Sequence, residues 1–223
     1  MFVNIILTQH PAEPYDRYPF AGLVSTLTRR LSMRYIILIF IAFLLLPSCQ
    51  TEKKADVQEN IQKARSLVKE FGGTLKPILV SHFKNDGPVA AIDVCSKSAP
   101  EIAQNLSKKS GWDIKRVSQK PRNLKTGTAD AWELKVLQSF IAAQQAGADV
   151  DTLEHYEVLT LEDGSRVFRY MKPQKTLKLC TACHGTSIDP AISTKLDALY
   201  PGDRARGFSV GDVRGAFSLK RKL

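Results

Sequence analysis

The sequence predicts an α+β domain built around one sheet of mostly antiparallel strands. Apolar residues at helical spacing dominate the chain after residue 55, and β-rich runs gather towards its end, an order typical of this class. Two of the β-rich runs are separated by Asp163-Gly164, which is a strong signal for a hairpin. A length of 223 residues suits a single domain of ordinary size.

The composition is that of a globular protein with a basic surface. Lys and Arg number 32 against 22 Asp and Glu, and the apolar fraction of 43% excludes a disordered tail, a collagen-like fibre and a disulfide scaffold. Nucleic-acid binding needs a clustered basic stripe, whereas the only basic run is residues 220–222, so no nucleic-acid partner is expected. The net charge of +10 suits anionic lipid headgroups or an acidic redox partner, and a solvated face without a role is the alternative.

Residues 33–49 have the plan of a lipoprotein signal peptide. Arg34 precedes a 12-residue apolar run at 35–46, which is shorter than the roughly 20 residues of a membrane span. The following Pro47, Ser48 and Cys49 resemble a lipobox, with Pro47 departing from the usual small or branched residue. We therefore expect an exported, periplasmic protein that is anchored to membrane lipid through acylated Cys49. Plain secretion and an uncleaved short anchor are the alternatives.

The start of the chain fits this signal poorly. Residues 1–32 contain three prolines and no sustained period, and Met33 is a natural start in front of Arg34. We interpret residues 1–32 as a mis-called leader, with a genuine long leader as the alternative. Residues 50–54 are expected to form a polar tether and residues 55–223 the folded domain.

A long helix is expected at the start of this domain. Apolar residues recur at helical spacing from Val57 to Phe71 and from Leu75 to Phe83. The pair Gly72-Gly73 is expected to interrupt the helix, and residues 85–88 (NDGP) are expected to end it.

The next elements are predicted from local signals. Residues 91–95 are expected to be extended, and Ser98 with Glu101 forms the pattern of a capping box that opens a helix ending at Gly111. Residues 113–120 alternate as a strand does, and residues 121–128 are expected to form a loop.

The second half of the chain contains a further helix and three strands. Asp130 is expected to cap a helix with Glu133 at the third position. The strands are expected at residues 156–161, 167–171 and 213–219, with a short helix that ends at Leu199. The residues expected on the buried face of the capped helix are Trp132, Val136, Leu137, Phe140 and Ile141.

Residues 180–184 (CTACH) carry the chemistry. C-x-x-C-H is the attachment motif of a c-type haem: Cys180 and Cys183 form thioethers to the haem vinyls, and His184 supplies an axial nitrogen to the iron. A thioredoxin-type pair normally opens a helix after a central strand, and a zinc site needs about four ligands, so neither fits well. A structural disulfide is the remaining alternative. The export signal agrees with haem c, because such haems are attached outside the cytoplasm.

The iron then needs a second axial ligand or an open site. The candidates in the mature chain are Met171, His82, His155 and Cys95. Cys95 has no other assigned role, and an unoccupied thiol is a liability in an oxidising compartment. It also precedes the expected helix start at Ser98, where a helix dipole favours a thiolate. Met171 is the alternative axial ligand.

The chain resembles the extracytoplasmic haem-c PAS-like family, a former domain of unknown function. This family includes stand-alone proteins and the ectodomains of sensor kinases and chemoreceptors, and the resemblance covers roughly residues 55–219. Its motifs are residues 90–96 (AAIDVCS), 99–103 (APEIA), 122–123 (RN), 132–133 (WE), 169–173 (RYMKP), 179–185 (LCTACHG) and 211–218 (GDVRGAFS). After Asn123 the chain has LKTG in place of the family's proline and second asparagine.

The resemblance implies a PAS-like antiparallel sheet flanked by helices, including the long N-terminal one. It implies one haem c, attached through Cys180 and Cys183, with His184 and Cys95 as the axial ligands. Arg122, Arg169 and Tyr170 lie in its motifs and are candidates for the haem pocket.

Two functions are compatible with such a site. Thiolate ligation favours ferric iron and is easily lost on reduction, which suits a redox or gas sensor that signals through a partner protein. A small electron-transfer cytochrome at the membrane surface is the alternative. We do not expect an enzyme, because a peroxidase needs an open position at the iron.

Overall fold

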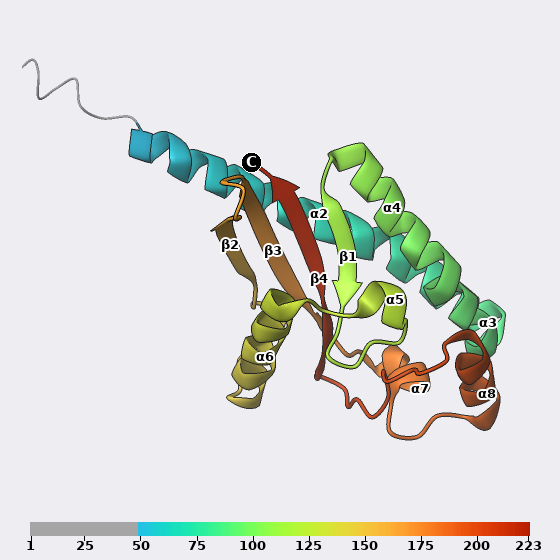
Figure 1. Ribbon diagram of the computed structural model, residues 1–223. Helices are drawn as coiled ribbons and strands as arrows, with labels where there is room; N and C mark the ends of the chain where they lie inside the picture. The colour runs from blue at the N-terminus through green and yellow to red at the C-terminus, as the bar shows by residue number, and fades with distance from the viewer. Residues whose placement is uncertain (1–48) are drawn as a thin grey trace, which may run out of the picture. The chain divides into compact units, whose positions relative to one another are not determined.

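One antiparallel sheet organises the computed structural model, which describes residues 49–223 (Figure 1). Its strands are β1 (Asp113–Val117), β2 (His155–Thr160), β3 (Arg166–Lys175) and β4 (Val213–Lys222), in the order β1-β4-β3-β2. The predicted α+β class is therefore confirmed. The predictions for residues 1–48, and for the acylated side chain of Cys49, lie outside the described residues.

The hairpin between β2 and β3 has the predicted turn. Its register runs from His155 opposite Met171 to Thr160 opposite Arg166. Gly164 has a φ of +78°, and the carboxylate of Asp163 accepts a hydrogen bond from the Ser165 backbone N–H at 2.9 Å. Asp and Gly are favoured in such turns because Asp bonds the backbone locally and Gly adopts positive φ without strain.

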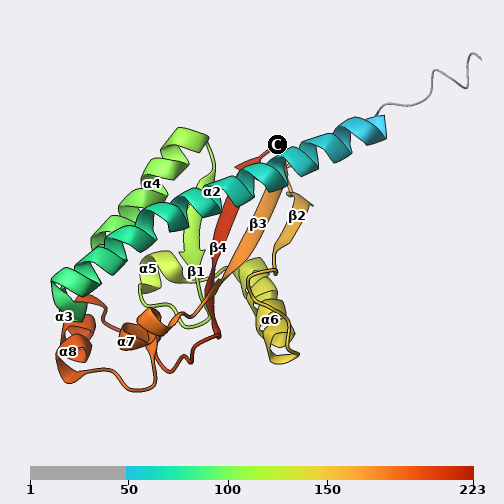
Figure 2. The same cartoon turned by 180° about the vertical axis from the view of Figure 1, so that it is seen from behind.

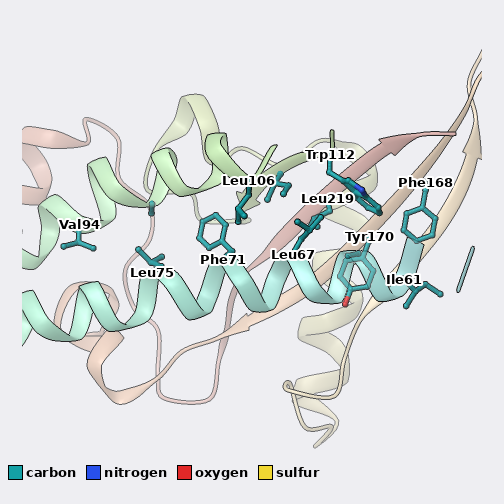
Figure 3. Packing of buried hydrophobic residues seen from close by; sticks show 13 residues of the cluster. Ile61, Leu67, Phe71, Leu75, Val94, Leu106, Trp112, Phe168, Tyr170 and Leu219 are labelled. Carbon is teal, nitrogen blue, oxygen red and sulfur yellow. The ribbon is translucent and has the colours of Figure 1, made fainter. Parts of the chain in front are cut away.

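The first helix is longer than predicted. Helix α2 (Cys49–Asn85) continues through Gly72-Gly73 and ends at the predicted residue, so the expected interruption is wrong. Each glycine costs about 1 kcal/mol of helix propensity. Phe71 and Leu75, on either side of the pair, are buried in one core cluster, as Figure 3 shows. Their burial holds the helix together where propensity alone would break it.

The extended segment predicted at residues 91–95 is helical. Helix α3 (Gly87–Asp93) passes into a π-helical turn (Val94–Ser98) and then into helix α4 (Ala99–Ser110). The Ala99 N–H bonds to the Val94 carbonyl, five residues back. Ser98 has helical angles and its side chain caps nothing, so the predicted capping box there is also wrong. Gly111 ends α4 with a φ of +74°, as predicted.

The remaining helices are short, apart from α6. Within the predicted loop, α5 (Leu124–Gly127) forms a single turn. Helix α6 (Ala131–Gln145) starts with the predicted capping box between Asp130 and Glu133. A 3₁₀ turn at residues 178–180 leads into α7 (Thr181–His184), and α8 (Pro190–Leu199) follows. In the described part of the chain, no helix combines the length and apolar character of a membrane span.

Helices cover both faces of the sheet (Figures 1 and 2). On one face, α2 and α4 pack through Phe71 and Leu106 against the β3 and β4 side chains Tyr170 and Leu219 (Figure 3). On the other face, α6 packs through Leu137 against Met171. A third cluster joins α3 to α8. The last turns of α2 extend past the sheet and border a cavity.

The continuity of α2 predicts the effect of a glycine substitution. Gly73→Ala should raise the free energy of unfolding by about 0.5–1 kcal/mol, because an added Cβ has open space and removes backbone entropy from the unfolded chain. Urea unfolding at constant m-value measures this difference.

Gly164→Ala is the matched control. Its Cβ also has open space, but the φ of +78° strains any L-residue, so this variant should lose about 1 kcal/mol. An equal loss in both variants would contradict a helical Gly73.

Candidate functional site

A cavity of about 780 Å³ lies at the end of the sheet next to α7. Cys95, Cys180, Cys183 and His184 all line it, although Cys95 is far from the other three in the sequence. The volume falls within the roughly 300–1,000 Å³ typical of sites for organic ligands. The structure therefore brings together the four predicted site residues.

Much of the cavity wall is apolar. The apolar lining comes from α2, the α3–α4 segment, the strands, the 3₁₀ turn before α7, and α8. It includes Leu75, Leu79, Phe83, Ala91, Ile92, Ala99, Ala103, Ile114, Val117, Leu177, Leu179, Leu196 and Phe217. An apolar wall with a few convergent polar groups is typical of a cofactor site.

Cys95 reaches the cavity from the π-helical turn. A π turn inserts an extra residue into a helix and changes which residues face a given side, and such turns occur frequently at functional sites. Helical backbone runs through Asp93 and Ser98, so no free helix start lies beside Cys95. The predicted position of Cys95 at a helix N-terminus is thus wrong, although the residue does line the cavity.

The C-x-x-C-H segment is wound tightly. The Thr181 hydroxyl donates to the Lys178 carbonyl at 2.8 Å, and the Gly185 N–H donates to the Thr181 carbonyl at 2.9 Å. These bonds place Cys180 and Cys183 one turn apart. A Cβ at Gly185 would overlap the Thr181 carbonyl oxygen, so this position needs glycine for close approach of the backbone.

His184 is held in one orientation and one tautomer. Its Nδ1 lies 2.9 Å from the Ala205 carbonyl oxygen, which can only accept, so Nδ1 carries the proton and Nε2 keeps its lone pair. Burial, followed by the positive charges of Arg214 and Arg122, holds the pKa of His184 well below its ordinary 6.5. A neutral imidazole with a backbone carbonyl on the second nitrogen is the usual state of a metal-binding histidine.

Arg122 organises the segment that supports His184. Its guanidinium donates to Asp203 at 3.2 Å and to the carbonyls of Cys183 and Ala205. Asp203 is 1% exposed and also accepts from the Ala205 N–H at 2.9 Å. Arg122 lines the cavity as predicted, and it positions both His184 and the carbonyl that orients its ring.

The structure does not bring Arg169, Tyr170 or Met171 to the cavity. Tyr170 is fully buried among the side chains packed under α2, and its hydroxyl donates to Glu154 at 2.8 Å. Arg169 pairs with buried Glu133 at 3.1 Å on the α6 side. Met171 is 0% exposed in the cluster against α6 and does not line the cavity.

The two other histidine candidates also lie elsewhere. His82 is on the exposed side of α2, where Nδ1 lies 2.8 Å from a carboxylate oxygen of Asp86. His155 starts β2 and packs near Trp132, with ring centroids 5.6 Å apart. Neither residue lines the cavity.

The sequence analysis missed two arginines in the cavity wall. Arg116 from β1 and Arg214 from β4 both line the cavity. Burial and the charge of Arg214 lower the pKa of Arg116, and the Arg214 Nε is buried without a hydrogen-bond partner. Arg214 stands in the 211–218 motif, whereas nothing in the sequence of β1 distinguishes Arg116 from a solvated arginine.

These side chains fit the predicted haem c better than the alternatives. Cys180 and Cys183 are not joined by a disulfide. No cluster of three or more acidic, cysteine or histidine side chains among residues 49–223 is arranged to hold a metal ion by itself. The cavity instead presents three thiols, a neutral imidazole and the two arginines Arg116 and Arg214. These groups suit an anionic macrocycle that brings its own iron.

The fold and site define an α+β domain with a C-x-x-C-H segment that lines a cavity. The chain belongs to the Tll0287-like family, whose model matches residues 48–221. The crystal structure of the cyanobacterial heme-protein Tll0287 aligns with a TM-score of 0.57 and 20% identity, covering 74% of this chain and 96% of that one. At this identity the likeness concerns the fold. No curated protein matches the sequence.

The tight turn after His184 predicts that Gly185→Ala disturbs the site. The added methyl must displace the Thr181 carbonyl and with it the ring of His184. With haem attached as the C-x-x-C-H motif predicts, we expect roughly a tenfold drop in covalently bound haem per protein, measured by pyridine haemochrome absorbance.

Gly147→Ala is the control, because its Cβ meets open space, only its φ of +92° adds strain, and it does not line the cavity. If both variants carry normal haem, the close approach at Gly185 does not matter for the site.

Proposed function

We propose that this chain is a c-type haem protein. Cys180 and Cys183 hold the haem covalently, and His184 and Cys95 are the axial ligands of its iron. The observation that carries this proposal is the convergence of these four side chains on one cavity. Membership of the Tll0287-like family and the likeness to a heme-protein support it.

The proposed ligands differ in how firmly the chain holds them. His184 is fixed through Nδ1 and the Arg122–Asp203 pair, so its Nε2 is available to iron. Cys95 belongs to a π turn, a rare helical geometry that occurs frequently at functional sites. In this proposal His184 is the constant ligand and Cys95 the one that responds to a change at the iron.

This difference favours a sensory role. Bound haem supplies an iron that exchanges one electron, and a cysteine thiolate favours its ferric state. Movement of Cys95 would alter the π turn inside the helical run from α3 to α4, and α3 packs against α8. We propose that a redox or gas signal at the haem passes through this run to a partner protein.

The proposal includes a cellular location. Thioether attachment of haem takes place outside the cytoplasm, which agrees with export directed by residues 33–49 and anchoring through acylated Cys49. The signal reaches an exported or membrane partner, and no catalytic turnover is required.

Covalent attachment is tested first. Protein made together with the haem-attachment machinery should keep its haem after denaturation, seen as peroxidase staining on a gel. Cys180→Ala with Cys183→Ala should lose this staining, because both thioether bonds are gone. A colourless parent protein would end the haem proposal.

Axial ligation by Cys95 is tested by spectroscopy. Cys95→Ala should abolish the long-wavelength charge-transfer band of a low-spin ferric imidazole–thiolate haem. It should also raise the reduction potential, since loss of an anionic ligand destabilises ferric iron. Haem content should be unchanged, because the thioethers do not involve Cys95.

Met171→Leu is the matched control, a substitution of similar volume in the α6 cluster. It should leave the spectrum and potential as in the parent protein. If instead Met171→Leu changes both and Cys95→Ala neither, the ligand is Met171 and the electron-transfer role becomes the better one.

A further inference from the structure

The cavity wall contains more basic than acidic side chains, so its positive charge is not fully balanced by carboxylates in the same wall. Most of its ionisable side chains are basic, and Asp151 is the acidic residue among them. Three of the basic residues have carboxylate partners: Lys115 pairs with Glu133, Arg122 with Asp203, and Lys175 with Asp149 and Asp151.

Arg116 and Arg214 are different. Among residues 49–223, neither guanidinium has a carboxylate partner, and the buried Arg214 Nε has no acceptor. The Arg116 guanidinium lies over the ring of Phe71, 5.6 Å from its centroid. A buried donor without a partner and two cations that repel each other are costly features that a bound anion would relieve.

We infer that Arg116 and Arg214 bind the propionate carboxylates of the haem. This inference rests on the proposed function, since it requires haem in the cavity. A guanidinium matches a carboxylate with two parallel N–H donors, so these residues would fix the orientation of the macrocycle as well as balance its charge.

The wall offers no better pair for this role. Lys76 and Lys120 are exposed, and the ammonium of Lys120 lies over the Phe208 ring, 5.3 Å from its centroid. Three of the five N–H donors of Arg122 are already used, by Asp203 and two carbonyls. Arg116 and Arg214 come from the paired strands β1 and β4, a rigid support that suits a fixed contact.

The test uses haem-loaded full-length protein and the variants Arg116→Gln and Arg214→Gln. Each should shift the propionate bending mode in the resonance Raman spectrum and lower the reduction potential, because removing a nearby cation favours the ferric state. Arg214→Lys should restore most of the potential but not the Raman mode, since lysine keeps the charge without the fork. Arg166→Gln, at an exposed position, controls for net charge and should change neither quantity.

Repeating the measurements in a Cys95→Ala background shows whether the positive charge of the two arginines acts on the propionates or on the Cys95 thiolate. If the arginines bind propionates, the fall in potential should be the same with and without Cys95. If the fall disappears in Cys95→Ala, the arginines act on the thiolate and the inference is wrong.

Inorganic phosphate tests for an external anion. Phosphate that raises the unfolding temperature of the parent but not of Arg214→Gln, with unchanged Raman modes, would assign the pair to that anion and overturn the inference. Unchanged modes and potential in both glutamine variants would also overturn it and leave the haem proposal intact. A parent protein without haem would instead remove the proposed function itself. Arg214→Lys and Arg116→Gln keep the test decisive if Arg214→Gln does not fold.

Discussion

The buried ion pair between Arg122 and Asp203 is the interaction on which the site depends. Asp203 is 1% exposed and receives Arg122 at 3.2 Å, Arg206 at 3.1 Å and the Ala205 N–H at 2.9 Å. Loss of one partner of such a pair typically costs 3–5 kcal/mol, because the other charge stays buried. In this chain it would also release the Ala205 carbonyl, which orients His184. Fold stability and ligand geometry are therefore coupled at one carboxylate.

The sequence predicted the features that depend on neighbouring residues, but it did not predict the features that depend on tertiary packing. The capping box at Asp130 and Glu133 and the turn at Asp163-Gly164 depend on residues within four positions of each other, and both form as predicted. The pair Gly72-Gly73 carries an equally clear local signal, yet α2 continues through it. The helix continues because Phe71 and Leu75 are buried against the sheet. The sheet is formed by residues distant in the sequence, so no local pattern predicts this burial.

The site residues also divide into those that a local motif predicts and those whose position depends on the tertiary fold. Residues 180–184 carry their chemistry in a contiguous motif, so sequence alone identified them. Met171 and Tyr170 could not be placed without the sheet, because neighbouring residues of a strand face opposite sides. Both sides of β3 are filled there, by α2 and α6, and the cavity begins only at Pro173. Arg116 was missed for a related reason, since the lack of a carboxylate partner is a property of the fold.

The charge of the proposed haem connects the role of Cys95 with the role of Arg116 and Arg214. A thiolate-ligated ferric haem with ionised propionates is a net anion, because the ring, the propionates and the thiolate together outweigh the charge of the iron. Arg116 and Arg214 supply cations where such an anion would lie, in a wall that is otherwise largely apolar. As a ligand, the Cys95 thiolate would favour ferric iron, whereas the arginines would oppose that preference by stabilising the more negative reduced state. The potential of the site would then be set by a balance between a ligand in a π turn and cations on two paired strands. A balance of this kind can be moved by a small displacement of Cys95, which is the property a sensor requires.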